Sequence, residues 1–120
     1  MARAINFFPK QVYIGGGNSN IVSLSEIFEI TEEYQIDLLE LRVWAANPYT
    51  LVVTGSIVTT SDPSFVDAAW KTLSGTFTQT GSGITTVTGL TGLGRFVRAK
   101  LDIPTTGVAC VCMTASAREQ

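Results

Sequence analysis

The clearest pattern along the chain is an alternation of apolar and polar positions over residues 94–103. Successive side chains of a strand point to opposite faces, so a period of two predicts a half-buried strand. Gly94 favours a turn before this strand, and Pro104 ends it. The apolar face consists of Val97, Ala99, Leu101 and Ile103, and the other face of Phe96, Arg98, Lys100 and Asp102.

Three further segments have strand character. Residues 37–45 alternate, with Trp44 on the polar face, and residues 50–60 are rich in the β-branched residues that favour strands. A short turn at Asn47-Pro48-Tyr49 separates these two segments, which predicts that they pair as an antiparallel hairpin. Residues 108–117 are small or apolar on both faces, as is typical of a strand in the centre of its sheet.

The remainder of residues 21–120 consists of shorter apolar runs separated by Gly, Pro, Asn and Ser. At most one helical turn is expected, at residues 67–69. Many short strands with regular turn signals, about seven to nine here, are typical of an all-β antiparallel sandwich of jelly-roll type. A chain of 120 residues has the usual size of one such domain.

Residues 1–20 differ from the rest of the chain. Their apolar residues Phe7, Phe8 and Tyr13 precede a triple glycine at residues 15–17, which is flexible and separates them from the predicted sandwich. A first strand and a loop is one interpretation. The other, which we adopt as the prediction, is an N-terminal arm with a Gly-rich linker that places the three aromatic side chains on a neighbouring subunit. The triple glycine lacks the Lys and Ser/Thr of a phosphate-binding loop.

Composition narrows the possible functions. Charged residues make up only 15% of the chain and hydrophobic residues 45%, so part of the surface is expected to be covered by another subunit. The net charge of −2 and the scattered basic residues predict no nucleic-acid partner. The chain shows neither a signal-peptide pattern nor an apolar run long enough for a membrane helix, so we expect no membrane association.

Few residues suit catalysis or metal binding. The chain contains no histidine, which is the commonest general base and metal ligand, and its many hydroxyl groups have no recognisable base beside them. The acidic cluster of residues 26–33 is interpreted as a charged strand edge. We therefore expect no enzymatic activity, no metal and no cofactor.

The two cysteines are Cys110 and Cys112. On a strand they share a face about 7 Å apart, which is too far for an easy disulfide. We predict that both are buried thiols or small apolar residues on one face, in a reducing compartment.

Two surfaces are candidates for binding. The outward face of the strand at residues 94–103 is basic and aromatic in a chain with little charge, so Arg95, Phe96, Arg98 and Lys100 are candidates for contact with another subunit. The alternative is an aromatic platform for sugar formed by Trp44, Tyr49, Phe65 and Trp70, with Trp44 and Tyr49 as its main candidates, although such residues also serve as core or subunit-interface anchors.

About two thirds of the chain, from Asp37 onward, resembles a group of small virion proteins of tailed phages. The likeness lies in a hairpin, a Thr-Ser-Asp-Pro loop, a tryptophan strand and a strand of the form leucine–glycine–arginine–aromatic–valine–arginine–alanine. The motifs are Leu39-Glu40-Leu41-Arg42-Val43-Trp44, Thr60-Ser61-Asp62-Pro63-Ser64-Phe65, Trp70-Lys71-Thr72-Leu73 and Leu93-Gly94-Arg95-Phe96-Val97-Arg98-Ala99-Lys100-Leu101.

This resemblance implies a capsid decoration, or cement, protein. Such proteins are jelly rolls or sandwiches that sit on the outer capsid as oligomers, often trimers, and bridge neighbouring capsid subunits. The implied partners are the major capsid protein and further copies of the chain in a homotrimer. The implied location is the virion surface, after assembly in the host cytoplasm. The alternative is a sandwich module of a tail, neck or spike that binds host carbohydrate.

Overall fold

The computed structural model describes residues 2–16, 21–30, 34–45, 52–103 and 106–119. Within them the chain is almost entirely extended, with a single short 3-10 turn, η1, at Asp67–Ala69, where one helical turn was expected. None of the described helical segments is long and apolar enough to cross a membrane. The strands are β1 Ala2–Gly16, β2 Ile21–Leu24, β3 Phe28–Glu29, β4 Tyr34–Ala45, β5 Val52–Thr60, β6 Lys71–Thr80, β7 Gly83–Leu90, β8 Phe96–Ile103 and β9 Thr106–Glu119.

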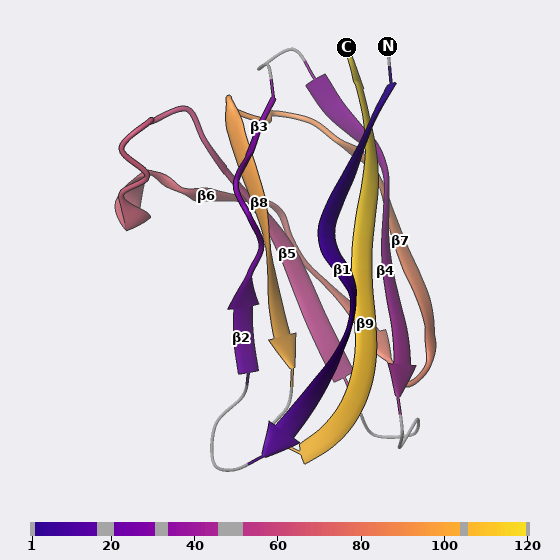
Figure 1. Cartoon of the computed structure of the whole chain (residues 1–120). Coiled ribbons are helices and arrows are strands. Elements are labelled where there is room, and N and C mark those ends of the chain that lie inside the picture. Colours follow the sequence, from indigo (N-terminus) through magenta and orange to yellow (C-terminus); the bar gives the residue numbers. More distant parts are fainter. Residues whose placement is uncertain (1, 17–20, 31–33, 46–51, 104–105, 120) are drawn as a thin grey trace.

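The strands form two antiparallel sheets that face each other (Figure 1). One sheet has the order β1-β9-β4-β7, and the other has the order β2-β8-β5-β6, with β3 also paired to β8. Strand β9 is central, between β1 and β4, as its two apolar faces predicted. This is the strand order of a jelly roll, in which a double sheet leaves few unpaired edges. The predicted all-β antiparallel sandwich is confirmed.

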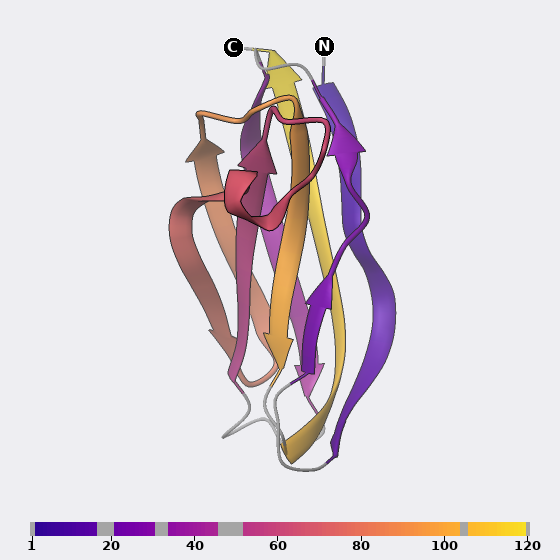
Figure 2. The ribbon, with the colours of Figure 1, turned by 90° about the vertical axis from the view of Figure 1, so that its left-hand side faces the viewer.

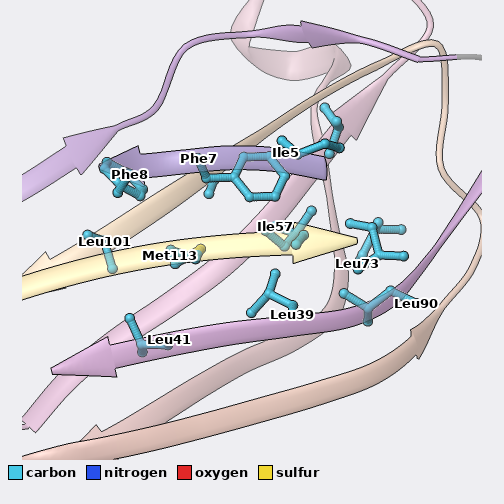
Figure 3. Packing of buried hydrophobic residues seen from close by; sticks show 14 of the residues in the cluster. Ile5, Phe7, Phe8, Leu39, Leu41, Ile57, Leu73, Leu90, Leu101 and Met113 are labelled. Atoms are coloured by element: carbon cyan, nitrogen blue, oxygen red, sulfur yellow. The ribbon is translucent and has the colours of Figure 1, made fainter. Parts of the chain in front are cut away.

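The core lies between the sheets (Figure 3) and is built from the inward positions of alternating strands. Burial of one such side chain contributes about 1.5–3 kcal/mol. The predicted inward face of β8 is confirmed, because Val97, Ala99, Leu101 and Ile103 are all 0% exposed. Labelled in Figure 3 are Ile5, Phe7 and Phe8 of β1, Leu39 and Leu41 of β4, Ile57 of β5, Leu73 of β6, Leu90 of β7, Leu101 of β8 and Met113 of β9.

The predicted hairpin of residues 37–45 with residues 50–60 is wrong. Strand β4 pairs with β7 and β9, whereas β5 pairs with β6 and β8 in the opposite sheet. The two segments each carry one apolar face, and both faces contribute to the core between the sheets. Gly55 of β5 leaves room for side chains of β6 and β9 in this core, because a Cβ there would lie 2.6 Å from the ring of Phe77 and 2.9 Å from the Cε methyl of Met113. The expected turn at residues 47–49 lies outside the described residues.

The predicted N-terminal arm is wrong for residues 2–16, which form strand β1. This strand pairs with β9 of the same chain from Ala2 opposite Arg118 to Gly16 opposite Thr106. Phe7 and Phe8 are 2% and 5% exposed and belong to the core. Register shifts on both sides of Phe8 break the alternation of the strand, which lets two consecutive aromatic side chains be buried.

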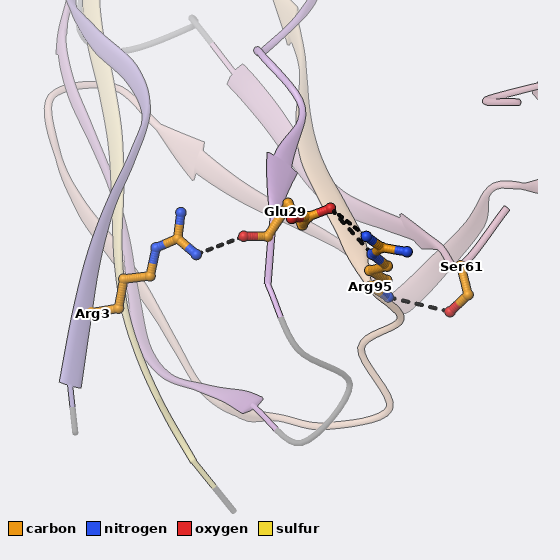
Figure 4. A network of polar contacts seen from close by, with 4 residues as sticks. All are labelled: Arg3, Glu29, Ser61 and Arg95. Carbon is orange, nitrogen blue, oxygen red and sulfur yellow. Dashed lines mark hydrogen bonds and ion pairs between the residues drawn. The ribbon is translucent and has the colours of Figure 1, made fainter. Parts of the chain in front are cut away.

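A small polar network connects β1 and β3 with the segment that leads into β8 (Figure 4). The Arg3 guanidinium of β1 donates to the main-chain oxygen of Glu29 in β3, at 2.6 Å. The Glu29 carboxylate pairs with Arg95, just before β8, at 3.0 Å. Both partners of this ion pair are more than half exposed, so it contributes at most about 1 kcal/mol.

Candidate interaction surfaces

The outer face of the β2-β8-β5-β6 sheet, which we call the loop-covered face, is overlaid by residues 61–70 (Figure 2). This connection begins with a tight turn at Asp62, whose carboxylate accepts hydrogen bonds from the Ser64 amide at 2.9 Å and from the Ser64 hydroxyl at 2.8 Å. These two bonds stabilise the ionised form and lower the pKa of Asp62 below its usual value. The turn therefore directs the next residue, Phe65, back onto the sheet.

Phe65 is the centre of the loop-covered face. Its ring stacks on Trp70 at a centroid distance of 6.0 Å and meets Phe96 of β8 edge-on at 4.8 Å. Its backbone φ is 56°, a left-handed conformation that is unusual for a bulky side chain. The aromatic contacts hold this strained conformation and reduce the exposure of Phe96 to 8%.

The second contact of the loop is made by Trp70. The Arg98 guanidinium of β8 lies 4.4 Å from the centroid of the Trp70 ring. Within the described part of the chain, the buried Nε of Arg98 and Nε1 of Trp70 have no hydrogen-bond partner. A cation held against an aromatic face contributes about 0.5–2 kcal/mol, so this contact helps to fasten the loop to the sheet.

These contacts revise the basic and aromatic face predicted for β8. Phe96 and Arg98 contact the chain's own loop, and Arg95 is paired with Glu29. Lys100 is exposed. The exposed apolar side chains of Val22, Leu24 and Val66 were not predicted from the sequence, and Phe65 was considered only as part of a sugar platform. For Val66 the available signal was an apolar pair next to a Pro/Ser turn. Exposed on this face are Val22 (54%), Leu24 (52%), Phe65 (37%) and Val66 (52%).

The outer face of the β1-β9-β4-β7 sheet, which we call the open face, has a different character. Its β4 side chains are Leu38, Glu40, Arg42 and Trp44, since the alternate residues of β4 are buried. Leu38 and Trp44 are 39% and 40% exposed. Ile84 of β7, opposite Arg42, is 49% exposed, and Val12 of β1, opposite Cys110 beside Trp44, is 57% exposed.

Two cations flank the Trp44 ring on this face. Lys10 Nζ lies 4.5 Å from the ring centroid and Arg42 Cζ lies 5.8 Å from it. Arg42 also approaches Glu40 of the same strand, at 3.7 Å. A shallow hollow beside the ring is lined by Arg42, Ser82, Gly83 and Ile84. The predicted sugar platform does not form as one surface, because Trp44 lies on the open face whereas Phe65 and Trp70 stack on each other at the loop-covered face. Tyr49 lies outside the described residues.

Cys110 and Cys112 are free thiols on the open face, half-buried and not in the core. The interpretation as buried thiols is therefore wrong, and the alternative, two small residues on one strand face, is correct. Partial burial raises the pKa of the Cys112 thiol, although the neighbouring Arg42 opposes the shift. Cys112 is thus a neutral thiol at physiological pH and not a reactive thiolate.

The remaining aromatic candidate for contact with a neighbouring subunit is Tyr13. Tyr13 pairs with Ala109 through the backbone of β1, and its side chain lies outside the described part of the structure. Among the described residues no group of three or more Cys, Asp or Glu side chains is placed to hold a metal ion.

Comparison with known proteins connects the chain to other structures through its fold. No protein-family model and no curated protein matches the sequence. A chain of the infectious bursal disease virus Gx strain has a TM-score of 0.60 at 6% identity, covering 98% of this chain and 31% of that one. This chain thus spans about a third of that viral chain.

Two other solved structures are similar over nearly their whole length. PirA has a TM-score of 0.55 at 7% identity, covering 96% of this chain and 92% of that one. A carbohydrate-binding module from the glycoside hydrolase family 9 protein Cel9A of Ruminococcus flavefaciens FD-1 has a TM-score of 0.53 at 13% identity, covering 98% of each chain. At these identities the likeness shows a shared jelly-roll sandwich, found in a virus particle and in a carbohydrate-binding module alike.

Proposed function

We propose that this protein is a non-enzymatic structural protein of the virion, a decoration protein that binds the outer capsid surface of a tailed phage and bridges capsid subunits. The observation that carries the proposal is the exposed apolar surface of a chain with only 15% charged residues. A surface of this kind marks a site of protein–protein contact. The fold shared with a chain of a virus particle and the sequence resemblance to phage virion proteins both support it.

The loop-covered face is the proposed capsid contact. Leu24 lies opposite the exposed Lys100 on neighbouring strands, and Phe65 and Val66 form an apolar projection held by the loop contacts. An apolar patch beside an exposed cation suits a partner surface that is apolar with an acidic rim. The major capsid protein is the proposed partner. Weak contacts repeated over many copies add up to a large stabilisation of the head.

The test is co-sedimentation with purified particles from which the protein has been removed. Leu24→Lys and Val66→Lys place charges in the proposed contact, at positions that are already half exposed, so the fold is retained. Each variant is expected to lose at least about tenfold in particle affinity. Thr91→Lys, at an exposed position of the β7–β8 connection and outside the four strands of this face, is the matched control and binds normally. Equal binding of all three variants and the parent would contradict this assignment.

A carbohydrate-binding module is the second candidate, favoured by one observation. Trp44 is 40% exposed on a sheet face and has Lys10 and Arg42 beside its ring, an arrangement that suits stacking against a sugar. The fold shared with the Cel9A module supports this candidate. A glycan array separates the two candidates, because the sugar-binding hypothesis requires a signal that disappears in Trp44→Ala and the decoration hypothesis requires none.

A further inference from the structure

We propose that the open face is a two-fold contact between two copies of this chain, in which β4 packs antiparallel across β4 of the second copy. The inference concerns the other side of the sandwich from the proposed capsid contact and does not depend on the proposed function. Its basis is the order of side chains along β4 and the charge pattern that this order creates.

The outward side chains of β4 form a self-complementary sequence. In chain order they are apolar Leu38, acidic Glu40, basic Arg42 and aromatic Trp44. A two-fold axis that lies in the contact plane and crosses β4 between Glu40 and Arg42 reverses this order in the second copy. It places Arg42 against Glu40 of the second copy, and Trp44 against Leu38 of the second copy. Each of these pairings occurs twice.

The electrostatics favour this arrangement over exposure to water. Within one chain the Arg42 and Glu40 side chains are 3.7 Å apart and are 42% and 35% exposed, a geometry that contributes little by itself. In the two-fold contact each carboxylate gains a second guanidinium, and each guanidinium gains a second carboxylate. The second partner of each charge offsets the cost of removing it from water, and no like charges of β4 are set opposite each other.

The neighbouring strand permits close approach. Beside the rows of β4 from Leu38 to Trp44, the outward side chains of central β9 are small: Cys110 pairs with Trp44, Cys112 with Arg42, Thr114 with Glu40 and Ser116 with Leu38. The next outward residue, Arg118, lies beyond these rows opposite Gln35, where its charge is paired with Asp37 at 2.9 Å. The Cys112 thiol is neutral and does not resist burial. The Lys10 ammonium lies beside Trp44, in the row that the two-fold axis sets against Leu38, Ser116 and Ala4 of the second copy, and these residues carry no charge.

The size of the face is sufficient for a specific contact. Sheets pack face to face with their strands within about 30° of each other, which the antiparallel arrangement of β4 allows. Four strands spaced about 4.8 Å apart and roughly eight to ten residues long cover on the order of 600 Å². Twice that area reaches the lower limit of about 1,200 Å² for stable specific interfaces. The contact forms a dimer and not the homotrimer that the sequence resemblance implied.

Sedimentation equilibrium of the purified full chain at several concentrations tests the proposal. The parent protein is expected at twice its chain mass of 12.9 kDa. Arg42→Glu places two acidic pairs in the contact and weakens dimerisation on the order of 100-fold, because opposed like charges cost several kcal/mol. The double variant Glu40→Arg/Arg42→Glu restores the opposite-charge pairs and the dimer. Lys100→Glu, an equal charge reversal on the loop-covered face, remains dimeric.

Rescue by the charge swap shows that the signs of the charges at positions 40 and 42 control dimerisation. Because the swap also restores the ion pair within one chain, the fold of Arg42→Glu is checked separately. Circular dichroism of each variant verifies the fold independently. A parent protein that stays at 12.9 kDa at all concentrations overturns the proposal. So does a trimer, or a dimer that the Arg42→Glu variant still forms, since either would use a different surface. Sugar binding at Trp44 would also overturn it, because the dimer covers that ring.

Discussion

The ring of Phe65 meets the ring of Phe96 edge-on, with centroids 4.8 Å apart. The contact joins a residue of the β5–β6 connection to the outer face of β8, and Phe65 makes it with a backbone φ of 56°. A strained backbone persists only where its surroundings hold it. The aromatic cluster is therefore what holds residues 61–70 against the sheet, and the shape of the proposed capsid contact depends on it.

We predict that Phe65→Gly is more stable than Phe65→Ala by about 1 kcal/mol, since the left-handed region costs L-residues roughly 1–2 kcal/mol and glycine almost nothing. Both variants lose the ring contacts with Phe96 and Trp70, so both are less stable than the parent. Urea denaturation followed by tryptophan fluorescence gives the three unfolding free energies. If the alanine variant is the more stable of the two, the conformation of Phe65 is not strained.

A second prediction concerns the hydroxyl of Thr59, which is 0% exposed. It donates to the main-chain oxygen of Phe96 at 2.7 Å and accepts from the Gly94 amide, also at 2.7 Å. Thr59→Val keeps the shape but leaves both main-chain groups without this partner, so stability falls by about 1–3 kcal/mol. The exposed Thr88→Val is the control, with a change below about 0.5 kcal/mol. Equal unfolding midpoints for the two variants would refute this role of Thr59.

A third prediction concerns pH. Hydrogen bonds from Ser64 lower the pKa of Asp62 below its usual value of 3.8 in the folded state. A lowered carboxyl pKa stabilises the fold at pH above the unfolded value, and this contribution is lost as the pH falls through the folded pKa. In Ser64→Ala the side-chain bond is removed, so the pKa of Asp62 rises. Carbon-13 NMR titration of the Asp62 carboxyl measures it, and an unchanged titration curve would rule out this cause.

Much of the fold can be derived from period-two patterns in the sequence. The inward faces of β4 and β8 were predicted correctly because a strand with one apolar face has only one way to bury it. For β9, which is small or apolar on both faces, the pattern predicted its central place in the sheet but not which face points inward. The partners of each strand were not predictable in the same way. Segments 37–45 and 50–60 have the composition of a hairpin, yet the same apolar faces also permit packing across a sandwich, and sequence proximity favoured the wrong choice.

The N-terminus shows how a local irregularity hides structure. Phe7 and Phe8 are adjacent, so a regular strand would bury one and expose the other, and the pair suggested an arm that contacts a neighbour. The register shifts beside Phe8 allow both to be buried. Bulges of this kind leave little trace in a single sequence, apart from Pro9 in the middle of the irregular region.

The candidate site was predictable in part. The outward direction of Trp44, Arg98 and Lys100 agrees with the alternation of their strands, and it is correct. The contact of Trp70 with Arg98 could not be predicted from the sequence. It depends on a backbone turn at Phe65, and the residue types there do not favour such a turn. The self-complementary order of Leu38, Glu40, Arg42 and Trp44 is visible in the sequence, but it acquires meaning only once the structure shows these side chains on one outer face.

The central claim is that the protein decorates a viral head, and quantitative mass spectrometry of purified particles tests it most directly. The measured quantity is the molar ratio of this chain to the major capsid protein. Decoration requires comparable copy numbers of the two proteins, that is, a ratio within about an order of magnitude of one. The reason is that all symmetry-equivalent sites on the capsid offer the same contact. A ratio that corresponds to only a few copies per particle would place the protein in a tail, neck or spike and contradict the proposal.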